Sequence, residues 1–228
     1  LLEDAVETEF ALNPDALLAR VRALPSQIKI VFIDEIQKVP KLLDVVHKLI
    51  EETDKQFILI GSSARKLRHG GANLLAGRAF ERYIFPMTHD ELKETFNLDA
   101  ILKWGSLPKI FSYADESDKF DYLMSYANTY LKQEIMLEQL VRKLDPFRKF
   151  LILAARSDGK IINFNSFANQ VGVDYKTVQN YFQILEDTYV EFRLPSFHRS
   201  VRKSQKVHPK FYLFDLGVKR ALERSLQD

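Results

Sequence analysis

A run of apolar, partly β-branched residues near the start of the chain, Lys29–Ile33, ends in the two carboxylates Asp34 and Glu35. Such a run is typical of a parallel strand that is buried on both faces of its sheet. The two carboxylates would then lie at the carboxyl end of the strand, where open α/β sheets place their ligands. The run therefore predicts both a buried strand and a candidate site directly after it.

Adjacent carboxylates at a strand end suit the hydrolysis of a nucleotide. Asp34 can hold Mg²⁺ while Glu35 orients the attacking water. A strand followed by Asp and Glu is the Walker B pattern of P-loop NTPases. A buried strand that ends in a solvated acidic turn has the same pattern, so the pattern alone leaves both interpretations open.

A second strand follows at the spacing of a βαβ unit. Residues 40–52 carry apolar side chains on one helical stripe, and residues 56–60 form another apolar run that ends in Gly61-Ser62-Ser63. Strand, crossover helix and strand predict two parallel neighbours whose carboxyl ends meet at one edge of the sheet. This favours a nucleotide site, because both strands would deliver polar residues to that edge.

Four further polar residues are candidates for nucleotide binding. Ser62 and Ser63 follow the second strand, Arg65 lies just beyond them, and Arg78 closes the next segment. On loops at the carboxyl edge of the sheet, either arginine could stabilise charge on a γ-phosphate. As solvated surface side chains the same arginines would have no such role, and the sequence leaves this open.

Helix and strand signals assign the remaining elements of the first half and the middle of the chain. Thr88 and Glu91 have capping-box spacing at the start of a short helix, and Pro86 stops the strand before it. The expected elements, in chain order, are a polar lead with a short helix (1–24), a strand (79–85), a short helix (88–94), and a helical connector (99–145) with one long helix (119–144).

Residues 147–197 have the element order of a winged helix-turn-helix. Three apolar helical stripes are separated by turns at Asp158-Gly159 and at Gly172, and an alternating strand follows at 189–194. The third helix, capped by Asp174, would carry an exposed polar face. That face consists of four side chains able to reach base edges: Lys176, Gln179, Asn180 and Gln183.

The segment over residues 196–209 is basic, with Arg199, Arg202 and Lys203 and no acidic residue. It fits a wing that follows the phosphates of duplex DNA. It equally fits a solvated loop whose charges balance the acidic first third of the chain. Because the third helix is nearly neutral, the winged-helix unit could also pack on the first domain as a lid or bind a protein partner.

Composition excludes several classes of protein. The chain has 228 residues, a formal net charge of +2 and no cysteine. Without cysteine it has no disulfide framework and no thiolate zinc site, and with this charge it has no global basic field. No apolar run reaches membrane-spanning length and no signal-peptide pattern opens the chain, so we expect a cytoplasmic protein that does not bind a membrane.

Four blocks of the chain are similar to one large prokaryotic family of AAA-type P-loop ATPases with a C-terminal domain of unknown function. The blocks are Asp34–Pro40, Gly61–Leu67, Asn73–Arg78 and Pro209–Asp215. The resemblance implies ATP and Mg²⁺ as ligands, with Asp34 as the Mg²⁺-side carboxylate and Glu35 as the water-activating one. It also implies a sensor near Ser62 or Ser63, and a phosphate or inter-subunit contact by Arg78.

Three departures from the family pattern bear on activity. The chain contains no G-x-x-x-x-G-K-[ST] loop and begins without Met, so we expect a fragment that lacks this loop through truncation. Ile60 stands where members often carry Thr, and the chain stops before the nuclease-like segment usual in the family. Because the first strand of an AAA core would separate residues 56–60 from 82–85, we expect the isolated chain to be unstable and to bind ATP poorly.

The sequence thus predicts an α/β fold in three parts. These are a partial AAA-type parallel sheet with flanking helices (1–98), the helical connector (99–145) and a winged-helix domain (146–228). The first functional hypothesis is an ATPase that acts as a nucleotide-dependent switch on its C-terminal domain, active when full length and inactive as a fragment. The alternative is a DNA-binding winged-helix module in which the ATPase half is only a scaffold.

Overall fold

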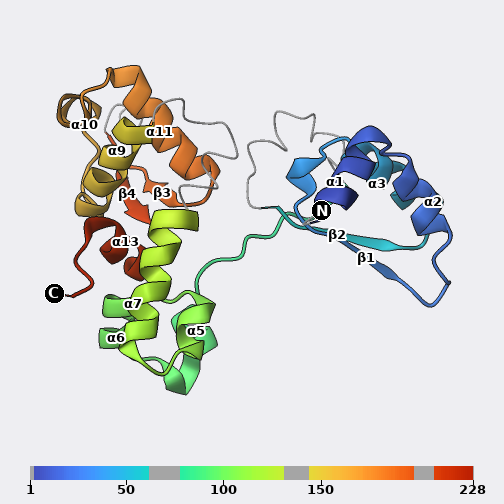
Figure 1. The fold of residues 1–228 in the computed structure, drawn as a ribbon, viewed down its shortest axis with the longest axis horizontal. Coiled ribbons are helices and arrows are strands. Elements are labelled where there is room, and N and C mark those ends of the chain that lie inside the picture. Colours follow the sequence, from blue (N-terminus) through green and yellow to red (C-terminus); the bar gives the residue numbers. More distant parts are fainter. Residues whose placement is uncertain (1–2, 62–77, 131–143, 198–207, 228) are drawn as a thin grey trace. The chain divides into compact units, whose positions relative to one another are not determined.

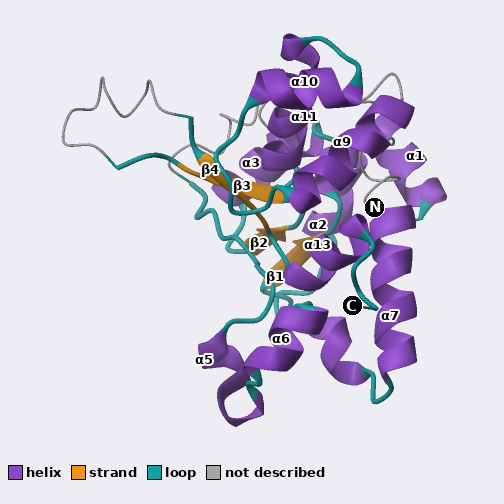
Figure 2. Cartoon of the chain, turned by 90° about the vertical axis from the view of Figure 1, so that its left-hand side faces the viewer, coloured by secondary structure: helices purple, strands orange, loops and turns teal. Residues whose placement is uncertain are grey.

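The computed structural model of the chain describes residues 3–61, 78–130, 144–197 and 208–227. The chain divides into two compact units, residues 1–82 and 83–228 (Figure 1). Each unit has its own hydrophobic core. Within the described residues each unit contains one two-stranded sheet among helices, with strands orange and helices purple in Figure 2.

The first unit is built on two parallel strands. β1 (Ile30–Ile33) pairs with β2 (Gln56–Leu59), with Ile30 opposite Gln56 and Ile33 opposite Leu59. The predicted parallel pairing is therefore confirmed. The other elements of the unit are α1 (Asp4–Leu12), α2 (Ala16–Arg22), the 3₁₀ turn η1 (Ile36–Lys38) and α3 (Leu42–Glu52), which connects the two strands.

Helix α3 provides more of the core of the first unit than any other element, because its apolar residues recur on one face. Leu42, Val46 and Leu49 are each at most 1% exposed. They belong to one cluster with Val21 of α2 and Ile33 of β1. Burial of each such side chain stabilises the fold by about 2 kcal/mol. The packing of α3 on the strands therefore determines where the strand ends lie.

The opposite face of this sheet is exposed. Ile30, Phe32 and Ile58 are 52%, 61% and 41% exposed, respectively. The prediction of a strand buried on both faces is therefore wrong for the described part of this unit. The reason is that the described helices cover only the face to which alternate strand residues point.

Two further predictions for the first unit are wrong. The expected polar lead contains the helix α1, which buries Phe10 in the core with Val6 packed beside it. The strand expected over residues 79–85 does not form, and Phe80 and Ile84 are 89% and 92% exposed. A strand needs a neighbour for its backbone hydrogen bonds, and in the described part of the chain none pairs with this segment.

The second unit is mostly helical. Its first helix, α5 (His89–Leu92), has the predicted capping box: the Thr88 hydroxyl accepts from the Glu91 N–H, and the Glu91 carboxylate accepts from the Thr88 N–H at 2.8 Å. The elements that follow are η3 (Lys93–Thr95), α6 (Leu98–Trp104), η4 (Pro108–Ser112), α7 (Glu116–Ser125), the π-helical turn η5 (Tyr126–Tyr130), α9 (Leu144–Arg156), α10 (Phe164–Val171), α11 (Tyr175–Asp187), β3 (Glu191–Leu194), β4 (Lys210–Leu213) and α13 (Leu216–Glu223).

The core of the second unit is aromatic. Phe147, Phe150, Phe182 and Phe211 are each at most 1% exposed. The rings of Phe150 and Phe182 meet edge to face with centroids 4.9 Å apart, an arrangement that the charge distribution of aromatic rings favours. Trp104, from the predicted connector, belongs to the same core. The helices that follow residue 98 and the C-terminal helices therefore share one packed interior.

Three helices and the strand β3 follow one another in the order expected for residues 147–197. Helices α9, α10 and α11 pack against one another, and β3 pairs antiparallel with β4, with Glu191 opposite Leu213. A single bridge joins Ile161 to Lys210 beside the hairpin. Helix α13, red in Figure 1, packs on α6, α7 and α9. Of the long helix predicted over 119–144, residues 131–143 lie outside the described residues.

One buried carboxylate ties the start of the second unit to its last helix. Asp215 is 4% exposed and accepts hydrogen bonds from the N–H groups of Ser106, at 2.7 Å, and Val218, at 2.9 Å. Burial raises the pKa of the Asp215 carboxyl, against the lowering effect of these N–H donors. A Cβ at Gly105 would lie 2.2 Å from an Asp215 oxygen, so only glycine leaves room for the carboxylate.

We predict that Asp215→Ala destabilises the second unit by about 2 kcal/mol or more, because it removes a helix cap and leaves buried N–H groups without an acceptor. Urea unfolding followed by the fluorescence of Trp104, the single tryptophan of the chain, measures this. The matched control is Asp174→Ala, which removes the exposed cap of α11. An equal loss in both variants would contradict a special role for the buried cap.

Candidate functional site

Asp34 and Glu35 follow the last residue of β1, and both are half-buried. Their loop is attached to the end of β2 by backbone hydrogen bonds. The Ile60 N–H donates to the Ile33 carbonyl at 2.9 Å, and the Ile36 N–H donates to the Ile60 carbonyl at 3.0 Å. The two carboxylates therefore lie at the carboxyl edge of the sheet, beside the residue that ends the second strand.

The turn at Glu35 has a backbone conformation that side chains disfavour. Its φ is 56° and its ψ is 40°, in the left-handed region, which costs a non-glycine residue about 1–2 kcal/mol. The Asp34 carboxylate accepts from the Glu35 N–H at 3.0 Å and supports this conformation. Such strained residues cluster at functional sites, and here the strain sets the direction in which Glu35 leaves the strand.

Gln37 contacts both strand ends. Its Nε2 donates to the Glu35 Oε2 at 2.5 Å, and Gln37 is only 3% exposed. A Cβ at Gly61 would lie 2.6 Å from the Gln37 Oε1, so the side-chain amide occupies space that glycine leaves open. Sequence reasoning missed Gln37 and Gly61 as site residues. The available signal for Gln37 was its place, with Lys38, between the apolar Ile36 and Val39.

The chemistry of this edge fits Mg²⁺ with a phosphate ligand. Carboxylate oxygens are the donors that Mg²⁺ prefers, and it is commonly held by one or two carboxylates together with water and phosphate oxygens. Asp34 supplies such a carboxylate. The described residues contain no group of three or more potential metal ligands, so a metal here would take its other ligands from the nucleotide, water or other residues.

The other predicted nucleotide-binding residues are not all described. Ser62, Ser63 and Arg65 lie outside the described residues. Arg78 is exposed, and its Nε lies 2.8 Å from the Glu51 carboxylate in the last turn of α3. Since α3 has eleven residues, its two ends are about 16 Å apart, and the loop carrying Asp34 and Glu35 precedes its other end. The described contacts of Arg78 therefore do not join it to the carboxylates.

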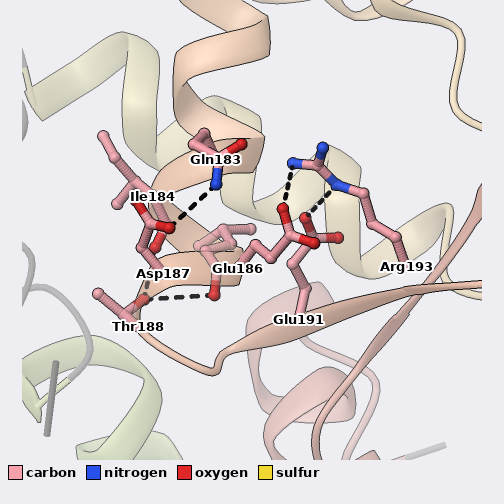
Figure 3. A network of polar contacts seen from close by, with 8 residues as sticks. Gln183, Ile184, Glu186, Asp187, Thr188, Glu191 and Arg193 are labelled. Carbon is pink, nitrogen blue, oxygen red and sulfur yellow. Dashed lines mark hydrogen bonds and ion pairs between the residues drawn. The ribbon is translucent and has the colours of Figure 1, made fainter. Parts of the chain in front are cut away.

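The polar face expected on the third helix is present on α11, where all four predicted side chains are exposed. The Gln179 amide donates to the Tyr175 hydroxyl at 3.4 Å, and the Gln183 amide donates to the Asp187 carboxylate at 2.9 Å (Figure 3). The other two members of the face are Lys176 and Asn180. The basic residues predicted to join this face, Arg199, Arg202 and Lys203, lie outside the described residues.

A network of charged side chains joins the end of α11 to the antiparallel pair of β3 and β4. Figure 3 shows the Arg193 guanidinium facing two carboxylates: Glu186 of α11 at 3.4 Å and Glu191 of β3 at 3.1 Å. Glu191 is only 3% exposed. Burial raises the pKa of Glu191 to about 7, although the neighbouring Arg193 opposes the shift. The last turn of α11 and the start of the hairpin are therefore joined by one shared guanidinium.

Comparisons with protein families agree with this division of the chain. A model described as an AAA domain matches residues 2–93, and a model described as a domain of unknown function, DUF8612, matches residues 95–227, more than half of the chain. The chain belongs to the DUF8612 family. It carries an AAA domain followed by this domain of unknown function, as the family resemblance in the sequence implied.

Three proteins similar to this chain carry names that call them uncharacterized. One from Haemophilus influenzae is 24% identical over 86% of this chain and 53% of its own length. One from Mycobacterium tuberculosis is 22% identical over 95% of this chain and 49% of its own length. One from Methanocaldococcus jannaschii is 29% identical over 78% of this chain and 46% of its own length. The chain thus spans about half the length of the curated relatives it matches.

The family boundary and the structural boundary differ by a short segment. Residues 83–93 belong to the AAA domain match but pack in the second structural unit, with the DUF8612 residues. There the Met87 N–H donates to the Ser106 carbonyl at 2.8 Å, and the ring of Tyr83 meets that of Tyr189 at 5.6 Å. In the described ranges, no helix of either domain has the length and apolar character needed to cross a bilayer.

We predict that the stability of the DUF8612 domain falls as pH rises from about 4.5 to 7. The folded domain keeps a proton on Glu191 up to its pKa of about 7, whereas the unfolded chain releases it near 4.5. The folded state therefore binds more protons in this range, and the free energy of unfolding decreases with pH, by up to about 3 kcal/mol.

Urea unfolding of Glu191→Gln at pH 5 and pH 7.5, followed by Trp104 fluorescence, tests this. The variant should lose most of the pH-dependent difference, because the amide does not titrate. Glu94→Gln, at an exposed carboxylate of the same unit, should keep the wild-type difference. If Glu191→Gln also kept the wild-type difference in stability between the two pH values, Glu191 would not be the source of that difference.

Proposed function

We propose that the whole protein binds Mg-ATP at the edge formed by the ends of β1 and β2 and hydrolyses it there. The observation that carries this proposal is the half-buried pair Asp34 and Glu35 at the end of β1, inside the segment matched by the AAA domain model. In this proposal the pair is the Walker B motif of a P-loop NTPase. Asp34 would hold Mg²⁺, which neutralises phosphate charge during phosphoryl transfer.

Glu35 is the proposed residue that orients the attacking water. One oxygen of its carboxylate accepts the hydrogen bond from Gln37, which leaves the other oxygen available to accept from water. The left-handed backbone at Glu35 ends the extended path of the strand at this residue. A carboxylate held in this way can position a water and accept its proton, as phosphoryl transfer to water requires.

Ser62, Ser63 and Arg65 remain proposed nucleotide-binding residues. They follow Gly61 in the chain, and the preceding Ile60 is hydrogen-bonded to the loop that carries Glu35. This connection supports a role for the serines as sensors of the γ-phosphate and for Arg65 as a phosphate contact. For Arg78, the ion pair with Glu51 argues against a phosphate contact beside Asp34 and leaves an inter-subunit contact as its proposed role.

The DUF8612 domain is the proposed target of a nucleotide-dependent switch. Its helices α9 to α11 and the hairpin of β3 and β4 have the element order of a winged helix. The segment over 83–93 supports a coupling between the two domains, because it belongs to the AAA match and packs with the DUF8612 domain. ATP hydrolysis would act on the second domain through this segment.

A second candidate function is the recognition of duplex DNA by α11. The observation that favours it is the exposure, on one helix, of all four side chains that could reach base edges. Amide side chains such as those of Gln179 and Asn180 can pair with adenine in the major groove, and Lys176 can contact guanine or phosphate. In this alternative the AAA domain would be a scaffold for the winged helix.

We predict that Glu35→Gln in the whole protein abolishes ATP hydrolysis and keeps Mg-ATP binding, because the amide cannot accept the proton of the attacking water. Turnover and equilibrium binding of a fluorescent ATP analogue measure the two effects. Asp54→Asn is the matched control, since it changes an exposed carboxylate before β2, at the opposite edge of the sheet. Hydrolysis at the wild-type rate in Glu35→Gln would contradict the assigned role.

We predict that Lys176→Ala with Gln179→Ala weakens duplex binding if α11 enters a groove, by about tenfold or more, since each lost base contact typically costs about 1–3 kcal/mol. Fluorescence anisotropy at two salt concentrations measures this. Lys149→Ala with Asn169→Ala, at exposed positions of α9 and α10, is the control. Unchanged affinity in the α11 variant would reject DNA reading by this helix and favour a protein partner.

A further inference from the structure

Three polar or charged side chains are buried in the described part of the chain: Gln37, Glu191 and Asp215. Burying a polar group is unfavourable unless it has hydrogen-bond partners. Asp215 caps a helix and the Glu191 Oε1 pairs with Arg193, so the contacts of both lie within the DUF8612 fold. Gln37 is different, because its amide faces the carboxylate of Glu35 at the edge of the sheet.

We infer that Gln37 is a positioning residue for Glu35, and that Gly61 at the end of β2 sets the place of Gln37. This inference rests on the proposed function, because it assigns Gln37 a role in hydrolysis through Glu35. The geometry that carries it is a chain of three contacts: the β2 end against Gln37, Gln37 against Glu35, and Asp34 against the Glu35 N–H.

The choice of an amide explains how Glu35 can be held without being neutralised. A glutamate side chain has several rotamers, and a single donor restricts it to those in which one oxygen meets that donor. The Gln37 Nε2 donates to the Glu35 Oε2 at 2.5 Å, and hydrogen bonds to an ionised acceptor are stronger than those between neutral groups. A Lys or Arg donor would bring a full positive charge beside the carboxylate, whereas the neutral amide leaves Glu35 able to act as a base.

Gly61 links this arrangement to the second strand. Any side chain at position 61 would meet the Gln37 amide, since even a Cβ would lie 2.6 Å from the Gln37 Oε1. The same strand end is fixed to the Glu35 loop by the bond from the Ile36 N–H to the Ile60 carbonyl. A shift of the residues that follow β2 would therefore move Gln37 and release the Glu35 carboxylate.

The test compares Gln37→Met, Gly61→Ala and Gln37→Ala with Glu35→Gln in the whole protein. Methionine keeps the size of the buried side chain and removes the N–H donor. We expect Gln37→Met to lower kcat by about 10- to 100-fold, the effect typical of losing a residue that orients a reacting group, with an unchanged Kd for Mg-ATP. If Gln37 had only a structural role, Gln37→Met would change the Kd for Mg-ATP and kcat together.

Gly61→Ala should lower kcat in the same way, because its methyl group displaces the amide. In the Gln37→Ala background, where the clash is absent, Gly61→Ala should have no further effect, and this non-additivity identifies Gln37 as the link. A readout without nucleotide is hydrogen exchange of the amides over residues 35–38. It should become faster in Gln37→Met and in Gly61→Ala, but stay unchanged in Asp54→Asn.

The outcomes separate this inference from the proposed function. If the wild-type protein hydrolyses ATP through Glu35 and Gln37→Met does so at the wild-type rate, the positioning role is overturned and the ATPase proposal stands. If the wild-type protein neither binds nor hydrolyses ATP, the ATPase proposal and the role of Gln37 in hydrolysis both fail. Hydrogen exchange would then still show whether Gln37 restrains the Glu35 loop. Slow exchange retained in Gln37→Met would overturn that restraint as well.

Discussion

The parallel pairing of β1 and β2 is the interaction on which the candidate site depends. The bond from Ile36 to the Ile60 carbonyl continues this pairing beyond the strands, so the loop carrying Asp34 and Glu35 leaves the sheet beside the end of β2. Packing of α3 against the sheet holds the two strands in place. The geometry of the carboxylates is therefore a consequence of hydrophobic burial in the core, which salt does not screen as it screens surface charges.

Local signals in the sequence were sufficient where the decisive partners are close along the chain. The stripe containing Leu42 and Leu49 identified α3, and the spacing of Thr88 and Glu91 identified the capping box of α5, because residues three or four apart meet on one helix. The two apolar runs, with a helix between them, identified the parallel pair. The same reasoning ordered the helices α9 to α11 from their apolar residues and from the cap at Asp174.

Features that depend on distant partners were not predictable in this way. The contact of Gln37 with Glu35 requires a left-handed residue in the turn and a strand end without a side chain at Gly61, and no local pattern encodes both. The strand expected over 79–85 had suitable residues but no described neighbour to pair with. For Asp215 the partner is Ser106, far away in the chain. The helix cap at Asp215 involves neighbours in the sequence and was predictable, but the hydrogen bond from Ser106 was not.

The wrong prediction that β1 is buried on both faces has a physical meaning. The continuous apolar run from Ile30 to Ile33 encodes burial on both faces, since a strand with one wet face would alternate with polar residues. In the described unit, Ile30 and Phe32 point away from the helices and are exposed. Exposed apolar surface of this kind marks a place where another layer packs. One face of the strand that precedes Asp34 and Glu35 packs on the core of its own unit. The residues of the other face are suited to burial, so the rigidity of the site edge depends on what covers that second face.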